Sequence, residues 1–149
     1  MSNLIYVPPN KDKKIISANL EILTTINDAV NDFPYAYDLN NWDFDEWWER
    51  IRLKGKGDCE DYALEKCLQL FEDCKWPRVE LMLCTVATEG YTRENHAIAY
   101  FKSEGIDIYG DNRQRGLVTA RDLYDIGYTP IRKQHFGGSG EWVKFGWQT

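Results

Sequence analysis

Three residues of the 149-residue chain have side chains that could together carry out acyl transfer: Cys59, His96 and Asp111. Cys59 follows Gly57 and Asp58 at the start of a run of good helix formers. Free backbone N–H groups and the positive end of a helix dipole favour a thiolate at such a position. A carboxylate beside a histidine fixes its tautomer and stabilises its cationic form, as a general base requires. These residue types therefore predict a nucleophile, a base and an orienting acid.

A predicted hairpin brings the histidine and the aspartate together. Its strands are expected at residues 94–101 and 106–111, where apolar and polar residues alternate. A tight turn centred just after Ser103 would place His96 directly opposite Asp111 on one face of the hairpin. A three-residue loop or a bulge would change this register.

Each of these residues also has a structural interpretation when it is taken singly. A histidine beside an aspartate is usually a structural hydrogen bond, and a first-turn cysteine is often only a neighbour of the helix cap. The glycine-flanked helix start, the strand histidine and the facing aspartate together favour catalysis. This interpretation requires the fold to lay the start of the Cys59 helix against the His96 strand.

The N-terminal half of the chain carries the apolar periodicity of amphipathic helices. We expect helices at residues 17–33, 43–52 and 58–74, each bounded by a capping residue, a proline or glycines. In the third helix Cys67 and Cys74 lie on the apolar stripe, so both are expected to be small buried hydrophobes.

The C-terminal half changes to the two-residue period of strands. Strands are expected at residues 79–86, 94–101, 106–111 and 141–145. Thr119 and Asp122 are placed as the capping box of a short helix, and His135 beside a glycine-rich turn is expected in a surface loop. Because helices come first and strands follow, we expect an α+β fold with an antiparallel sheet packed on the helix that begins at Cys59.

Charge and hydropathy exclude two classes of partner. The chain carries 18 Lys and Arg residues against 24 Asp and Glu residues, a formal net charge of −6 that attracts no phosphate backbone. No apolar run approaches the roughly 18 residues of a membrane-spanning helix. We therefore expect neither nucleic acid nor a membrane as a partner.

The N-terminal residues carry an expectation about the compartment and the domain boundary. MSNLIYVPPNKDKKII places its basic residues after a short apolar stretch, which is not the order of a secretory signal, so a cytoplasmic protein is expected. Its four cysteines are then expected to be reduced, and none has the CxxC spacing of a zinc site. The prolines and lysines predict an extended arm at residues 1–14, followed by a single domain at residues 15–149.

The strings GKGDCEDYALEKCLQL, ENHAIAYF and IYGDN resemble the bacterial transglutaminase-like cysteine proteinases, the family of the LapG-type periplasmic proteases. The resemblance extends from about Ile26 to Phe145, and GDCEDYA is its most specific part. It implies a papain-like (transglutaminase-like) core, a protein or peptide substrate, and a catalytic triad of Cys59 as nucleophile, His96 as base and Asp111 as orienting residue.

The resemblance also implies a calcium site, because acidic residues that flank the nucleophile bind calcium in LapG-like members. The matching positions are Asp58, Glu60 and Asp61, and a bound cation would offset the rise that these carboxylates cause in the pKa of the Cys59 thiol. Alternatively, they are favourable first-turn charges with Asp58 as N-cap. We favour the second interpretation, because calcium takes about six to eight oxygen ligands. The chemistry itself requires no cofactor.

The leading function is hydrolysis of a peptide or amide bond through a thioester on Cys59, whose backbone N–H is the natural first oxyanion donor. Transamidation or deamidation of glutamine is the nearest alternative, and a non-catalytic protein-binding module on the same fold is another. LapG-like members are exported, whereas a signal-free chain would suit a phage-encoded or intracellular enzyme. Aromatic residues near the nucleophile could line a substrate groove or belong to the core: Trp42, Trp47, Trp48 and Tyr62.

Overall fold

The computed structural model describes residues 4–7, 20–34, 58–76, 78–88, 93–103, 106–136 and 140–148. Its helices are α1 (Leu20–Asn31), α3 (Cys59–Leu68), the π-helix η1 (Gln69–Asp73) and α4 (Ala120–Asp125). Its strands are β1 (Leu4–Tyr6), β2 (Val79–Ala87), β3 (Arg93–Ser103), β4 (Ile106–Gly110), β5 (Val118–Thr119), β6 (Tyr128–His135), β7 (Trp142–Lys144) and β8 (Gly146–Gln148). None of the helices in these ranges is long and apolar enough to cross a membrane.

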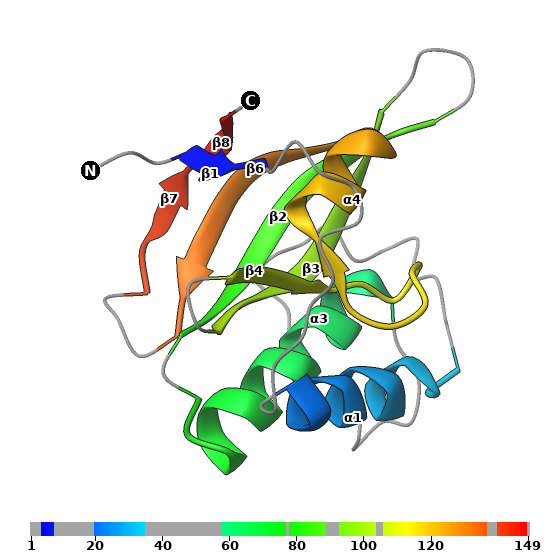
Figure 1. Cartoon of the computed structure of the whole chain (residues 1–149), viewed down its shortest axis with the longest axis vertical. Coiled ribbons are helices and arrows are strands. Elements are labelled where there is room, and N and C mark those ends of the chain that lie inside the picture. Colours follow the sequence, from blue (N-terminus) through cyan, green and yellow to red (C-terminus); the bar gives the residue numbers. More distant parts are fainter. Residues whose placement is uncertain are drawn as a thin grey trace.

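A six-stranded antiparallel sheet forms the centre of the molecule, with the strand order β5-β4-β3-β2-β6-β7. Helix α3 packs against β3 and β2, and α1 lies beside α3 (Figure 1). The expected α+β architecture, with the Cys59 helix packed on an antiparallel sheet, is therefore confirmed.

Strand β6 is absent from the elements expected from the sequence. It pairs with β2, and its register shifts between Leu83 and Cys84, where Pro130 lies opposite Cys84. Proline cannot donate to a strand ladder, so this segment does not carry a regular strand signal. The structure also corrects the expected loop position of His135, because this residue ends β6 and its Nδ1 lies 3.4 Å from Glu80 Oε1.

The helix that follows the candidate nucleophile changes its pitch near its end. The backbone N–H of Cys74 donates to the carbonyl of Gln69, a π-helical step that is wider than an α-turn. Cys74 is therefore turned off the apolar stripe and is exposed, contrary to the expectation from helical spacing. Cys67, which precedes this step, is fully buried as predicted.

Part of the expected N-terminal arm belongs to the fold. Residues 4–7 are extended, as predicted, but β1 pairs in parallel with β8 at the other end of the chain (Figure 1). Ile5 and Val7 are each only 5% exposed, so these residues are packed rather than free of the core. The domain boundary at residue 15 stays a prediction.

Several sequence-based expectations lie outside the described residues. They are the helix at residues 43–52, the cap at Ser17 and the proposed groove residues Trp42, Trp47 and Trp48.

Candidate active site

A capping box places Cys59 at the first position of α3. Asp58 is the N-cap, and its carboxylate accepts a hydrogen bond from the Asp61 N–H at 3.3 Å. The Asp61 carboxylate in turn accepts from the Asp58 N–H at 3.0 Å. Because the two residues satisfy each other's backbone donors, the helix begins at the cysteine and not elsewhere.

The Cys59 sulfur lies against β3 at Ala97, the residue that follows His96 in the chain. Burial, with a smaller contribution from the charges of Asp58 and Glu60, raises the pKa of the Cys59 thiol to about 12. The backbone N–H of Ala97, which points at the sulfur, and the Arg113 guanidinium act in the opposite direction. The resting thiol is therefore protonated at neutral pH, and attack on a carbonyl requires a base.

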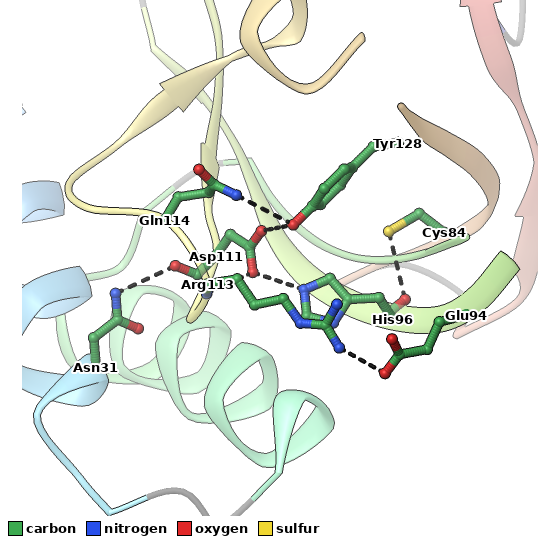
Figure 2. A network of polar contacts seen from close by, with 8 residues as sticks. All are labelled: Asn31, Cys84, Glu94, His96, Asp111, Arg113, Gln114 and Tyr128. Carbon is green, nitrogen blue, oxygen red and sulfur yellow. Dashed lines mark hydrogen bonds and ion pairs between the residues drawn. The ribbon is translucent and has the colours of Figure 1, made fainter. Parts of the chain in front are cut away.

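The candidate base and the candidate orienting acid form a buried pair. His96 Nε2 lies 2.7 Å from Asp111 Oδ1, and both side chains are inaccessible to solvent. The Tyr128 hydroxyl donates to the other oxygen of the carboxylate, and the Arg113 N–H donates to Asp111 Oδ1 at 3.1 Å. Figure 2 shows His96 of β3 and Tyr128 of β6 reaching the two oxygens of the Asp111 carboxylate.

The hydrogen bonds determine the ionisation of Asp111. Burial opposes the charged form, but the bonds from His96, Tyr128 and the Arg113 N–H outweigh it and lower the pKa of the carboxyl group. Asp111 is therefore a carboxylate at neutral pH, able to accept the Nε2 proton of His96.

The register of the β3–β4 hairpin differs from the prediction. Asp107 pairs with Lys102, so His96 does not face Asp111 directly and the ladder is displaced by two residues. A displacement by an even number leaves every side chain on its predicted face, because strand side chains alternate with a period of two. Asp111, just after the end of β4, consequently reaches His96 as a diagonal neighbour.

His96 has one ring nitrogen available for chemistry. Nε2 is bonded to Asp111, whereas Nδ1 is buried and has no hydrogen-bond partner in the part of the chain that the structure describes. If Nε2 carries the proton that Asp111 accepts, the basic lone pair is on Nδ1. The ring is held edge-on by Tyr128, with 5.8 Å between the ring centroids.

A cavity of about 360 Å³ opens beside the start of α3. Glu60, the residue after Cys59, forms one wall, and strands β2, β3, β6 and β7 of the sheet form the others. The lining is mostly apolar with a few polar groups, as is common for ligand-binding sites. Its residues are Glu60, Leu83, Cys84, Asn95, His96, Ile131, Arg132 and Trp142.

Tyr62 has the contacts of a core residue. It is 2% exposed, packs with Val30, and donates its hydroxyl hydrogen to the carbonyl of Phe33. Its assignment to a substrate groove stays a prediction.

The described residues do not fit a calcium site. Asp58 and Asp61 direct carboxylate oxygens to the backbone of the helix start, as a capping box requires. Among the described residues, no three or more His, Cys, Asp or Glu side chains are grouped to hold a metal ion. We therefore assign no catalytic step to calcium.

Burial and the neighbouring carboxylates of Asp58 and Asp61 make the charged form of Glu60 unfavourable. Burial, Asp58 and Asp61 raise the pKa of Glu60 to about 7. A carboxyl group with a raised pKa binds more protons in the folded state, so it lowers stability as the pH rises from about 4.5 to about 7.

Glu60→Gln is expected to remove this loss of stability at high pH. Because Glu60 is only half-buried, solvent screening reduces the effect, and we expect a gain of about 1 kcal/mol in unfolding free energy at pH 8. Little change is expected at pH 4, where the carboxyl group is neutral in both states. Urea unfolding at the two pH values measures the difference, with the exposed Glu21→Gln as the matched control. An equal gain at both pH values would contradict the electrostatic cause.

Sequence reasoning missed Tyr128 and Arg113 as members of the site. Tyr128 is the first residue of β6, the strand whose signal Pro130 weakens. Arg113 follows the aspartate by two residues in a turn, and an aspartate that accepts a hydrogen bond from the backbone two residues later is a known turn signal. That signal could have identified Arg113.

The amino-acid sequence was compared with models of known protein families. A family model described as bacterial transglutaminase-like cysteine proteinase (BTLCP) matches residues 8–149. No curated protein sequence matches the chain.

Solved structures of Legionella pneumophila LapG have a similar fold. The calcium-bound form has a TM-score of 0.64 and 19% identity, over 82% of this chain and 66% of that chain. A second LapG structure has a TM-score of 0.62 and 22% identity, over 83% and 68%. The EGTA-treated form has a TM-score of 0.60 and 19% identity, over 84% and 72%. The chain thus spans about two thirds of LapG, and the likeness is one of fold.

Proposed function

Because the chain belongs to the bacterial transglutaminase-like cysteine proteinases, we propose that it hydrolyses a peptide or amide bond in a protein substrate. The reaction uses Cys59 as nucleophile, His96 as base and Asp111 as orienting residue. The observation that carries this proposal is the buried His96–Asp111 pair, in which Nδ1 of His96 is not bonded to Asp111. The next residue after His96 is Ala97, whose backbone N–H acts on the Cys59 sulfur.

The first half of the reaction forms a thioester. His96 Nδ1 takes the thiol proton as the Cys59 sulfur attacks the substrate carbonyl carbon, and the Asp111 carboxylate stabilises the resulting imidazolium. The C–N bond then breaks, and the imidazolium gives its proton to the leaving amine. The negative charge on the carbonyl oxygen is stabilised by the backbone N–H of Cys59 at the helix start.

The second half of the reaction releases the acid product. Water attacks the thioester while His96 removes its proton, and the C–S bond breaks to return the thiol. An amine in place of water would give transamidation, and a glutamine side chain as substrate with water as acceptor would give deamidation.

The cavity beside Glu60 is the proposed substrate site. It adjoins the nucleophile through Glu60 and the base through His96, and its apolar walls suit the side chain of a bound peptide. Its volume is within the range of about 300–1,000 Å³ that is usual for ligand pockets.

Mass spectrometry of a proteome treated with the wild-type protein and with Cys59→Ala tests this function. Hydrolysis predicts new peptide termini in the wild-type sample alone. Mass gains at glutamine, either of about 1 Da or of an added amine, would instead support deamidation or transamidation. A wild-type sample identical to the variant sample would contradict the enzyme assignment.

Calcium is proposed to be dispensable for this chain, although one of the similar LapG structures is calcium-bound. Because Asp58 and Asp61 serve the helix cap, we expect about 1 mM calcium or EGTA to change Tm by less than about 1 °C. A site of micromolar affinity would raise Tm by roughly 10 °C at that concentration. Differential scanning fluorimetry measures the shift, with magnesium as the control. A rise of several degrees that is specific to calcium would overturn the proposal.

A further inference from the structure

Lys66 is a buried cation that the proposed chemistry does not use. It lies on α3 about two helical turns after Cys59, and it is 1% exposed. Its Nζ atom is buried without a hydrogen-bond partner within the described ranges. An ammonium group in such a place costs several kcal/mol unless a nearby negative charge compensates it. The question is therefore which negative charge compensates the Lys66 ammonium group.

The side chain of Lys66 extends toward the end of β4. A Cβ atom added at Gly110 would lie 2.6 Å from Asn27 Oδ1 and 3.4 Å from Lys66 Cδ. The lysine stem and the Asn27 amide thus meet over Gly110, the residue before Asp111. Only a residue without a side chain leaves room for this contact.

Two amides of α1 complete the polar group behind Asp111. Asn31 Nδ2 donates to the backbone carbonyl of Asp111 at 3.3 Å, as Figure 2 shows. The oxygen atoms of Asn27 and Asn31 are buried and, like Lys66 Nζ, have no hydrogen-bond partner in the described part of the chain. Asn27 Oδ1 lies near the Lys66 stem at Gly110, and such an acceptor is chemically complementary to the three donors of an ammonium group.

Asp111 is the leading opposite charge for Lys66. Burial lowers the pKa of Lys66 to about 8, and the charge of Asp111 is the strongest influence in the opposite direction, ahead of Cys67 and Asp28. Asp111 itself faces His96, the Tyr128 hydroxyl and the Arg113 N–H. The carboxylate is therefore bonded by the groups of the site, while Lys66, whose stem lies beside Gly110, acts on it through space without a hydrogen bond between the two described side chains.

We propose that Lys66 is a positioning residue that acts through Asp111, holding its buried carboxylate ionised and in place while His96 is neutral. The proposal rests on the proposed function. A base must be neutral before it accepts a proton, and in that state His96 cannot balance the charge of Asp111. Without Lys66, the buried charge is balanced only when Asp111 or His96 is protonated, and either event removes the base.

A double-mutant cycle on stability tests the coupling without any substrate. Lys66→Met, Asp111→Asn and the double variant are compared by urea unfolding at pH 7. Each single variant leaves one buried charge uncompensated, whereas the double variant leaves none. We expect the double variant to lose clearly less stability than the two single losses together. Additive losses would overturn the proposal.

Lys133→Met provides the matched control for this cycle. Lys133 is a partly buried lysine on β6 that pairs with Glu80 at 2.9 Å. The loss of stability in Lys133→Met should add to the loss of stability in Asp111→Asn. If Lys66→Met does not fold, recovery of folding in the double variant supports the coupling, and failure of both to fold overturns it.

A pH profile separates positioning from simple packing. Alkylation of Cys59 by iodoacetamide is followed from pH 5.5 to pH 8, with the exposed Cys74 as internal reference. Removing the Lys66 cation raises the pKa of Asp111, so the carboxylate that supports the base is lost at a higher pH. Lys66→Met should therefore slow labelling of Cys59 about 10-fold at pH 5.5 and much less at pH 8. An equal change at both pH values would overturn the proposal. Because no substrate is used, this result is independent of the cleavage assay.

Discussion

Replacing Cys59 with alanine is expected to lower the rate of substrate cleavage by about 10⁵-fold or more, which is the usual effect of removing the nucleophile of a triad. No other described residue at this helix start has a thiol. The change removes only a sulfur atom from a partly buried site, so we expect Tm to change by no more than about 2 °C. Cleavage of a peptide identified by mass spectrometry, together with thermal unfolding, measures both quantities.

Cys74→Ala is the matched control for this substitution. Cys74 is exposed on the π-helical end of the same helix, where it contacts no member of the site, and its loss should leave cleavage unchanged. Retention of a tenth or more of the wild-type rate in Cys59→Ala would contradict the role of this residue.

Alkylation kinetics show whether His96 activates the thiol. Since burial and neighbouring carboxylates raise the pKa of Cys59 to about 12, its thiolate is scarce at neutral pH without help from a base. His96→Ala should therefore slow labelling of Cys59 by about 10-fold or more relative to Cys74 in the same sample. Labelling that does not depend on His96 would favour the non-catalytic binding module.

Asp111→Asn is expected to lower the cleavage rate by about 10⁴-fold, since the asparagine imposes the wrong tautomer on the histidine. The carboxylate now accepts hydrogen bonds from His96, the Tyr128 hydroxyl and the Arg113 N–H. An amide must turn its NH₂ group toward one of these partners. If that partner is Nε2, the ring proton moves to Nδ1, and the lone pair that should receive the thiol proton is lost.

The same substitution should also reduce stability, by about 3 kcal/mol at pH 7, because a neutral amide cannot replace all the hydrogen bonds that the buried carboxylate accepts from His96, Tyr128 and the Arg113 N–H. The pKa of Asp111 is lowered in the folded state, so its contribution is present above the unfolded value and is lost as the pH falls through the folded value. The difference between wild type and variant should accordingly be full at pH 7 and shrink below about pH 4.

Asp107→Asn is the control for the loss of a carboxylate on the same hairpin. Asp107 accepts a hydrogen bond from Tyr100 and pairs with Lys102, away from His96. We expect it to reduce stability without a comparable loss of cleavage. Equal rates for Asp111→Asn and the wild type would show that the pair with His96 is only structural.

Local features of the fold could be predicted from the sequence because their causes lie within a few residues. The N-cap at Asp58 and the capping box at Thr119 need only a short polar side chain or its acidic partner three residues later, and both form as expected; Asp61 in addition completes a box at Asp58. The strand predicted at residues 79–86 is β2, which is rich in β-branched and aliphatic residues. The meeting of His96 and Asp111 could also be anticipated, because a register error of two residues preserves the face of every side chain.

Features that depend on contacts between distant segments could not be predicted in this way. Cys74 leaves the apolar stripe because of a π-helical turn, and β6 forms although its proline weakens the strand signal. The pairing of β1 with β8 joins the two ends of the chain, and no local pattern encodes such a pairing.

The sequence by itself determined which side chains could act as nucleophile, base and acid, because residue type and helix or strand position decide that. Only the tertiary structure decided their charges and orientation. Burial raises the pKa of the Cys59 thiol, the bond to Asp111 leaves Nδ1 of His96 as the open nitrogen, and packing of α1 and α3 brings the Lys66 stem beside Gly110, the residue before Asp111. These effects come from desolvation and from neighbours far apart in the chain, and both exist only once the chain has folded.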